Sequence, residues 1–498
     1  MQPGHDSVAE MRASLLALVL VLIGCDTPSP VAVASLTLTP CHVRGVNNET
    51  RCGVLLRPED PSKPDGRQLP LRVVMLPAVS PTPAADPLFL LAGGPGQAST
   101  EIIALVAPAL RRIHSRRDLI FVDQRGTGAS NALDCPEDDE DPLTALSGPS
   151  EADEIVDCLR VVQAHADLNF YGTSLAADDL DAVAEALGYA QVNVFGGSYG
   201  TRLGLEWARR HPSRVRTLIL DGVAPPQEPI LGGSAGDAAA AFEALVRDCE
   251  ADPSCAPLNP KDDLLALLTE LQTPRPAQLD HPRTGEPLSV EIDADHLLGL
   301  LRGMLYAPDL ARLMPLALDD ARSGELGPFL AQASMATGGA AAGMSLGLTL
   351  TVICAEDAPR LTPSNAPPVS VERIGATAPQ SFLEMCAVWP RAEVDPSFFE
   401  AVSVATPTLL LSGGLDPVTP PRLAELAKET LPNAVHGVAP GAGHGVITQR
   451  CAPKLARLLI ESGTTEGLDL SCLDTVTRPA FHTSRLGAAP PEAPDAAR

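Results

Sequence analysis

The sequence predicts an α/β protein in which a mostly parallel sheet is flanked by helices and interrupted by an inserted helical lid. Short runs of apolar residues alternate with segments of helical periodicity, and most of these runs are apolar throughout, as strands covered on both faces should be. The alternation stops between residues 225 and 404, where the pattern is helical, and it returns at Thr408. An insertion explains this return better than a separate domain does.

The predicted elements follow one another along the chain. Seven apolar runs are the expected strands: 71–76, 87–92, 118–123, 192–196, 217–221, 408–413 and 434–439. Four segments between or after them are the expected helices: 174–187, 199–210, 421–431 and 453–461. The lid, 225–404, divides the core into the parts 36–224 and 405–481, and an Ala/Pro-rich tail, 482–498, is predicted to be disordered.

The first 25 residues are typical of an export signal. The apolar run 15–23 is too short to span a bilayer, follows Arg12 and ends in "LIGC". This ending resembles a bacterial lipobox and predicts Cys25 as the lipidated first residue of the mature chain, with an incidental cysteine as the alternative. Because acidic residues precede Met11, where a signal should be basic, we expect Met11 to be the true start. The protein is therefore expected in the bacterial cell envelope, in contact with a membrane only through its lipid.

The remaining cysteines agree with export. Ten of the 11 cysteines follow Cys25 and fall into neighbouring pairs, for which local disulfides are the simplest assignment. The predicted pairs are Cys41 with Cys52, Cys135 with Cys158, Cys249 with Cys255, Cys354 with Cys386, and Cys451 with Cys472. The alternative is a metal site, but no CxxC or His-Cys cluster has ligand spacing, so neither a metal nor a cofactor is expected.

The charge of the chain narrows the possible partners. A formal net charge of −26 argues against nucleic acid, whose phosphates must be met by clustered Lys and Arg. A small, positively charged substrate would be more compatible with the negative electrostatic field of such a chain. The number of subunits is left open.

A candidate nucleophile lies where the strand 192–196 passes into the helix 199–210. The segment "GGSYG", residues 196–200, matches G-x-S-x-G, the nucleophile elbow of the α/β-hydrolase fold, in which small neighbours allow the tight turn that raises the serine. Ser198 is the predicted nucleophile. The helix that begins at Tyr199 also directs its N-terminal amides toward an oxyanion formed there.

A serine hydroxyl needs a base and an orienting carboxylate, which in this fold follow in the order Ser, Asp, His. Asp416 lies just after a predicted strand, and His444 lies in a glycine-rich loop after the last strand. The competing residues are His436, which lies within a strand pattern, and Asp221, which follows the serine too closely. The loop "AGGPG", residues 92–96, predicts the second oxyanion donor, so that the amides of Gly94 and Tyr199 form the pair.

These motifs, in this order, resemble a known family. The segments "AGGPGQ", "FVDQRGTGAS", "GGSYGT", "LSGGLDPVTPP" and "GAGHG" look like those of the prolyl iminopeptidase and tripeptidyl aminopeptidase family, serine peptidase family S33. Family members usually have histidine before the G-G-P-G turn and often tryptophan after the serine, where this chain has Ala92 and Tyr199. These changes leave the backbone donors intact and bear on proline specificity. The export signal and paired cysteines are more similar to the secreted, tripeptidyl branch.

The resemblance implies a serine aminopeptidase that removes one residue or a tripeptide from a free peptide N-terminus through an acyl-enzyme. It also implies that lid carboxylates anchor the substrate's ammonium group, for which Glu356 and Asp357 in "VICAEDAP" are the candidates; a solvated acidic loop is the alternative. An esterase or lactonase on the same scaffold is a second possible function. The third is a catalytically inactive lipoprotein that binds peptides.

Overall fold

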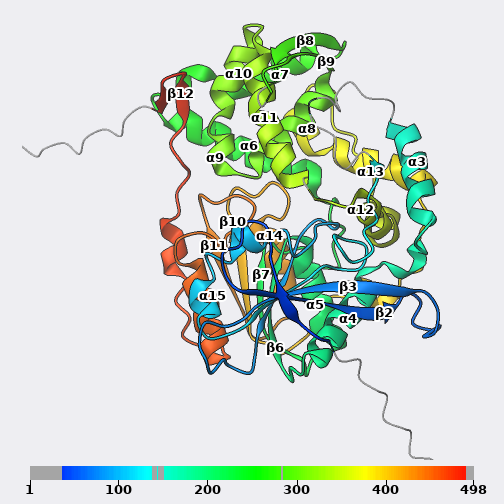
Figure 1. Ribbon diagram of the computed structural model, residues 1–498. Coiled ribbons are helices and arrows are strands. Elements are labelled where there is room, and N and C mark those ends of the chain that lie inside the picture. The colour runs from blue at the N-terminus through cyan, green and yellow to red at the C-terminus, as the bar shows by residue number, and fades with distance from the viewer. Residues whose placement is uncertain (1–35, 137–142, 144–150, 282–283, 342, 489–498) are drawn as a thin grey trace, which may run out of the picture. The chain divides into compact units, whose positions relative to one another are not determined.

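A nine-stranded sheet lies at the centre of the part of the chain that the structure describes (Figure 1). The structure is a computed structural model and describes residues 36–136, 143, 151–281, 284–341 and 343–488. The strands are arranged in the order β1-β2-β3-β5-β4-β6-β7-β10-β11. Their bounds are β1 Thr39–Cys41, β2 Thr50–Pro58, β3 Gln68–Leu76, β4 Leu88–Leu91, β5 Leu119–Val122, β6 Val192–Gly197, β7 Val215–Asp221, β10 Thr408–Gly413 and β11 Ala434–Ala439.

The sheet is mostly parallel, as predicted. The six strands from β5 to β11 in this order pair in parallel, whereas β1, β2 and β3 form an antiparallel edge. Every residue of β4, β5 and β10 is buried, which explains why these runs are apolar throughout. All seven predicted strands are present. Strands β1 and β2 were not predicted: β1 has only three residues, and the short apolar stretch of β2 lies between Arg51 and Arg57.

Helices cover both faces of the sheet. The four predicted helices correspond to α4 (Thr173–Ala186), α5 (Tyr199–Arg210), α14 (Pro421–Lys428) and α15 (Ala452–Ser462). One buried cluster joins alternate strand residues to α4, α5, α14 and α3 (Glu151–Gln163). The other strand residues form a second cluster with α15 and the short helices α1 (Ile103–Val106) and α2 (Arg111–His114). The sheet is thus buried on both sides.

The chain between β7 and β10 is predominantly helical (Figure 1). Its helices are α6 Ser234–Ala251, α7 Pro260–Glu270, α8 Ala294–Leu305, α9 Pro308–Ala311, α10 Met314–Arg322, α11 Leu326–Ala341, α12 Leu346–Val352 and α13 Thr377–Val388. Helices α6 to α11 have a hydrophobic core of their own, whereas α12 packs into the core of the sheet. The prediction of a helical segment is wrong at one place, where β8 (Arg275–Asp280) and β9 (Pro287–Ile292) form a hairpin.

Short turns of other helical types complete the description. They are η3 Leu168–Phe170, η4 Ala256–Leu258, η6 Ala358–Arg360, η7 Val371–Gly375, η8 Pro396–Phe399 and η9 Ser471–Thr475, together with a π-helical turn, η5 Ile353–Asp357.

The predicted disordered tail is wrong for residues 482–488. They form a small hairpin of β12 (His482–Ser484) and β13 (Gly487–Ala488). The backbone N–H of His482 donates to the carbonyl of Arg312, and Arg485 forms ion pairs with Asp320 and Glu325. These contacts with the helical segment order the hairpin. Residues 489–498 lie outside the described residues.

All five predicted cysteine pairs are confirmed as disulfide bonds. The bonds join Cys41 to Cys52, Cys135 to Cys158, Cys249 to Cys255, Cys354 to Cys386, and Cys451 to Cys472. Each bond links neighbours in the sequence, at separations from 6 to 32 residues, so that each closes a local loop. These ten cysteines are therefore not available as metal ligands, and the alternative of a cysteine metal site is wrong.

The predicted signal and Cys25 lie outside the described residues. Among the helices in the described ranges, none combines the length and the apolar character needed to span a membrane.

Candidate active site

Ser198 lies at a sharp turn between β6 and α5. Its backbone has a φ of 54° and a ψ of −125°, a conformation that is rare and costly for a residue with a side chain. The turn is held because the N–H of Ser198 donates to the carbonyl of Asp221 at 2.9 Å, and the Thr201 hydroxyl donates to the Ser198 carbonyl. Such a strained turn presents the hydroxyl at the end of the strand.

Two glycines make this turn possible. A Cβ added to Gly196 would lie 2.3 Å from the carbonyl oxygen of Gly200, and one added to Gly200 would lie 2.4 Å from that of Leu91. Neither position can hold a larger residue. Gly197 differs, because an added Cβ would meet only the Phe195 ring at 3.8 Å, so the expectation that its small size is required is wrong.

Asp416 lies in the turn that follows β10 and is fully enclosed. Its Oδ1 accepts hydrogen bonds from the N–H groups of Val418 and Thr419, at 2.8 and 2.9 Å. Its Oδ2 lies 2.8 Å from Nδ1 of His444. Burial alone would raise the pKa of Asp416. The pKa is instead held below its usual value by the charge and hydrogen bond of His444 and by the hydrogen bonds from the two N–H groups. The carboxylate is therefore an acceptor, and Nδ1–H of His444 donates to it.

His444 is held by several elements. The backbone N–H of His444 donates to the backbone carbonyl of Tyr306 at 2.9 Å. The His444 ring packs edge-on against the Tyr306 ring, with centroids 5.3 Å apart. Asp221 holds the next residues, because its carboxylate accepts from the N–H groups of Val446 and Ile447. Burial would lower the pKa of His444, but the Asp416 charge and hydrogen bond raise it above its usual value. The imidazole is thus prepared to accept a proton on Nε2.

Thr419 joins this pair and was missed in the sequence. Its hydroxyl donates to Oδ2 of Asp416 at 2.7 Å, and its Oγ1 lies 3.0 Å from Nδ1 of His444. The Nδ1–H group therefore lies between two acceptors. The sequence does contain a signal for Thr419. This hydroxyl residue follows Asp416 by three positions, in a short turn between Pro417 and Pro420.

Ser198 and His444 line the same cavity, which has a volume of about 480 Å³. The walls are mainly apolar and come from the loop after β4, the elbow, the turn after β10 and the helical segment, including Ile353 and Phe382. Among the lining residues, only Asp221 and Arg302 belong to the charged types Asp, Glu, Lys and Arg. An apolar cavity with a few convergent polar groups is typical of a site for a small organic ligand.

Gly93, Gly94 and Tyr199 also line this cavity. A Cβ added to Gly93 would lie 3.1 Å from Cβ of Ser198, so this glycine permits the loop to approach the nucleophile. Gly94 has a φ of +107°, which glycine adopts without strain. The predicted oxyanion donors thus lie along the wall that contains Ser198.

The competing residues are engaged elsewhere. In His436, Nδ1 lies 2.6 Å from Glu425 and Nε2 lies 2.9 Å from Ser412, and it is not among the residues that line the cavity. Asp221 lines the cavity, but its oxygens accept hydrogen bonds from the backbone N–H groups of Val446 and Ile447. Burial raises the pKa of Asp221 to about 6, although these hydrogen bonds oppose the rise. Within the described ranges, no group of three or more His, Cys, Asp or Glu side chains could hold a metal ion.

Comparison with known proteins extends these observations. The family described as "alpha/beta hydrolase fold" matches residues 86–250, which contain Ser198, and the family described as "TAP-like protein" matches residues 370–472, which contain Asp416 and His444. The chain belongs to the prolyl iminopeptidase and tripeptidyl aminopeptidase family of α/β-hydrolases. This serine peptidase family is the one that the ordered motifs resemble.

Several curated proteins are similar to this hydrolase. Serine protease Hip1 of Mycobacterium tuberculosis is 27% identical over 533 residues, covering 94% of this chain and 99% of that protein. Carboxylesterase B of the same organism is 28% identical and covers 41% of this chain and 42% of that protein. Proline iminopeptidase of Neisseria gonorrhoeae is 31% identical over 145 residues, covering 29% of this chain and 34% of that protein.

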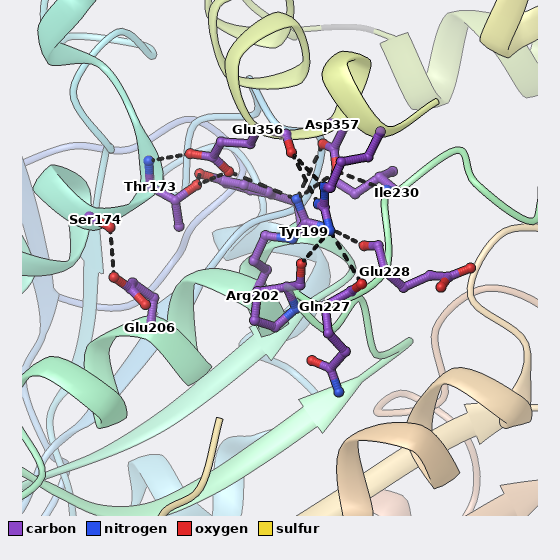
Figure 2. A network of polar contacts seen from close by, with 12 residues as sticks. Thr173, Ser174, Tyr199, Arg202, Glu206, Gln227, Glu228, Ile230, Glu356 and Asp357 are labelled. Atoms are coloured by element: carbon purple, nitrogen blue, oxygen red, sulfur yellow. Dashed lines mark hydrogen bonds and ion pairs between the residues drawn. The ribbon is translucent and has the colours of Figure 1, made fainter. Parts of the chain in front are cut away.

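The structure corrects the roles predicted for two acids of the segment between β7 and β10. Glu356 and Asp357 are 2% and 0% exposed and are not among the residues that line the cavity. Asp357 accepts from Arg202 at 3.0 and 3.2 Å and from the N–H of Ile230 (Figure 2). Nη2 of Arg360 lies 3.4 Å from the same carboxylate. Because arginine already neutralises this carboxylate, Asp357 does not anchor an ammonium group. The solvated-loop alternative is equally wrong.

Glu356 instead supports the elbow. Its carboxylate accepts from the N–H and the hydroxyl of Thr173, both at 2.8 Å, and the same hydroxyl lies 2.8 Å from the Tyr199 hydroxyl (Figure 2). Burial raises the pKa of Glu356 to about 7, although Arg202 at 3.8 Å opposes the rise. The tyrosine that replaces the family's usual tryptophan is thus tied to a buried acid.

Proposed function

We propose that this hydrolase is an exported serine peptidase that releases residues from the free N-terminus of peptides through an acyl-enzyme. The observation that carries the proposal is that Ser198 and His444 open into one apolar cavity while Asp416 lies behind His444. Ser198, Asp416 and His444 are the proposed nucleophile, orienting acid and base. This constellation serves acyl transfer on unrelated folds as well.

The proposed reaction takes two steps. Nε2 of His444 removes the proton from Ser198 as its Oγ attacks the peptide carbonyl, and the amides of Gly94 and Tyr199 stabilise the oxyanion. The imidazolium, stabilised by Asp416, then gives its proton to the leaving amine. Water next attacks the acyl-enzyme with His444 as base, which releases the N-terminal product.

The proposal of an exopeptidase rests on two observations. Residues of the proposed lid line the cavity, and the chain is similar to known peptidases. Residues 225–404 form the proposed lid, and three of their residues, Tyr306, Ile353 and Phe382, line the cavity together with Ser198. A long folded chain does not fit such a space, whereas a peptide end does. The N-terminal direction is inferred from the family and its tripeptidyl and proline-specific members.

An esterase is the second candidate. The observation that favours it is that the same serine, histidine and amides suffice for an ester, and one relative is named a carboxylesterase. The lack of an available carboxylate among the cavity residues also removes the ammonium anchor that the sequence had led us to expect.

The location of the enzyme belongs to the same proposal. Five disulfide bonds are typical of a protein that folds outside the cytosol. We propose attachment through a lipid on Cys25 and removal of the residues before it. Replacing Cys25 by serine should move the protein from the membrane fraction to the soluble fraction, and unchanged membrane recovery would contradict lipidation.

The proposed activity is tested with three substrates: a fluorogenic peptide amide with a free N-terminus, its N-acetylated twin and a simple acyl ester. We expect the free peptide to react faster than the acetylated one by about tenfold or more, the scale on which a pocket rejects an extra group. Ser198→Ala should abolish all three reactions. Equal rates on the two peptides would overturn the aminopeptidase assignment. Ester turnover without peptide turnover would favour the esterase.

A further inference from the structure

Arg302 is a charged residue of the cavity that the proposed reaction does not use. It lies in α8, four residues before Tyr306, whose ring packs against His444. Its guanidinium carbon lies 5.7 Å from the centre of the Tyr306 ring. No residue in the described ranges accepts a hydrogen bond from Arg302 or forms an ion pair with it, and its Nε is buried without a partner.

Two buried arginines of the interior, by contrast, have acidic partners. Arg202 is bound by Asp357, and Arg125 forms two hydrogen bonds with Asp179, at 2.7 and 2.9 Å. Arg302 is half-buried and has no acidic partner among the described residues, and its guanidinium fork matches the geometry of a carboxylate. A bound carboxylate would supply the acceptors that the described chain does not.

The position of Arg302 indicates which part of a substrate it meets. In the proposed reaction His444 protonates the leaving amine, so groups beside His444 and Tyr306 face the leaving part of the substrate. Arg302 is near enough for its charge to act on His444, since it opposes the rise in the pKa of that residue. In the same reaction the acyl part would lie on the other side of the bond, toward the elbow and the loop after β4, which line the cavity as well.

We propose that Arg302 is a specificity residue that binds a carboxylate on the leaving part of the substrate. The inference rests on the proposed acyl transfer and goes beyond it, because it names the chemistry of the leaving group. The carboxylate has two possible sources. One is the C-terminal α-carboxylate of a short peptide whose last residue is the leaving group, and the other is an acidic side chain on the residue after the cut.

The test compares matched leaving groups. Ala-Ala and Ala-Ala-Ala-Ala, each as free acid and as C-terminal amide, release alanine or alaninamide after removal of one residue or of a tripeptide. We expect kcat/KM to be about 10- to 100-fold higher for the acid, the range for a hydrogen bond to a charged group. In Arg302→Gln this ratio should fall to within about twofold of one, and Arg302→Lys should keep part of it.

Three further measurements separate the outcomes. Ala-Glu-NH2 against Ala-Ala-NH2 reports on the side-chain source, and a preference lost in Arg302→Gln supports the proposal through that source. Arg247→Gln removes an exposed charge from α6 and should keep the wild-type ratio. Thermal unfolding shows whether each variant is folded.

The same proposal remains testable where peptides do not react. O-acetyl-lactate and O-acetyl-lactamide carry the same acetyl group and differ only in the leaving part, so their ratio reports on Arg302 in an esterase as well. Wild-type ratios near one for every pair would overturn the proposal. A preference for the acid that survives in folded Arg302→Gln would also overturn it.

Discussion

Two clusters of buried carboxylates lie near the start of α5, and their partners differ. The first, which we call the histidine cluster, consists of Asp416, Thr419 and His444. The second, the arginine cluster, consists of Glu356, Asp357 and Arg202 (Figure 2). In the first, the partner of the acid is a histidine, which can gain and lose a proton and borders the cavity. In the second, the partner is an arginine, which is permanently charged and buried.

The two clusters differ in their capacity for proton transfer. A carboxylate bound to arginine stabilises the fold, but it has no partner that can accept a proton from a substrate. A carboxylate bound to histidine can hold an imidazolium that forms during a reaction. The arginine cluster still reaches the site indirectly, because Thr173 connects Glu356 to the Tyr199 side chain at the elbow.

The largest effect is expected in the histidine cluster. Asp416→Asn should lower kcat for the ester by about 10⁴, because the amide favours the wrong imidazole tautomer and does not stabilise the imidazolium. In the wild type, the raised pKa of His444 should place the acidic limb of the kcat/KM profile above 6.5. In the variant this limb should move to lower pH. A rate within tenfold of the wild type would show that Asp416 does not orient the base.

The second effect is on stability. Asp357→Asn removes the nearer of the two acids beside buried Arg202, and it should lower the free energy of unfolding by about 3 to 5 kcal/mol. Urea denaturation with intact disulfides measures this loss. The folded enzyme should keep the same preference for free over acetylated N-termini. A lost preference in a stable variant would restore the role in ammonium binding that the structure argues against.

The third effect depends on pH. Because burial raises the pKa of Glu356 from 4.5 to about 7, the folded protein keeps this proton while the unfolded chain loses it. Its contribution to stability is therefore present below pH 4.5 and is lost as the pH rises through 7, by up to about 3 kcal/mol.

Glu356→Gln should remove that part of the pH dependence, so that the variant gains stability relative to the wild type between pH 5 and pH 8. Urea denaturation at both pH values measures the difference. Exposed Glu400, changed to glutamine in the same way, provides the control. An unchanged difference between the two pH values would show that Glu356 is ionised throughout.

The two clusters also mark the limit of what the sequence could predict. The parallel strands were predictable because most of them are continuous apolar runs, and the glycines around Ser198 indicated the turn. Glu356 and Asp357 were misassigned because their partner Arg202 lies 155 residues from Asp357, and its burial depends on how α5 packs. The sequence did not indicate Arg302 either, because the presence or absence of a partner also depends on how distant segments pack. Arg302 is of interest because no described residue pairs with it.

The smallest effect should come from Thr419. Its hydroxyl is the second acceptor beside Nδ1 of His444 and donates to the Asp416 oxygen that holds the same group. Thr419→Val has nearly the same shape but lacks the hydroxyl, so Asp416 loses one donor and the imidazole one acceptor. We expect kcat for the ester to fall by about tenfold, which corresponds to about 1.4 kcal/mol, the net value of one hydrogen bond.

A change in packing would not produce the same pattern. Thr419→Ser keeps the hydroxyl and removes a methyl group, so it should retain most of the rate while it loses some stability. Because the lost hydrogen bond acts on the histidine, the acidic limb of the pH profile should shift in Thr419→Val and not in Thr419→Ser. A valine variant with the wild-type rate and profile would reduce the histidine cluster to Asp416 and His444 alone. A serine variant as slow as the valine variant would assign the effect to the methyl group.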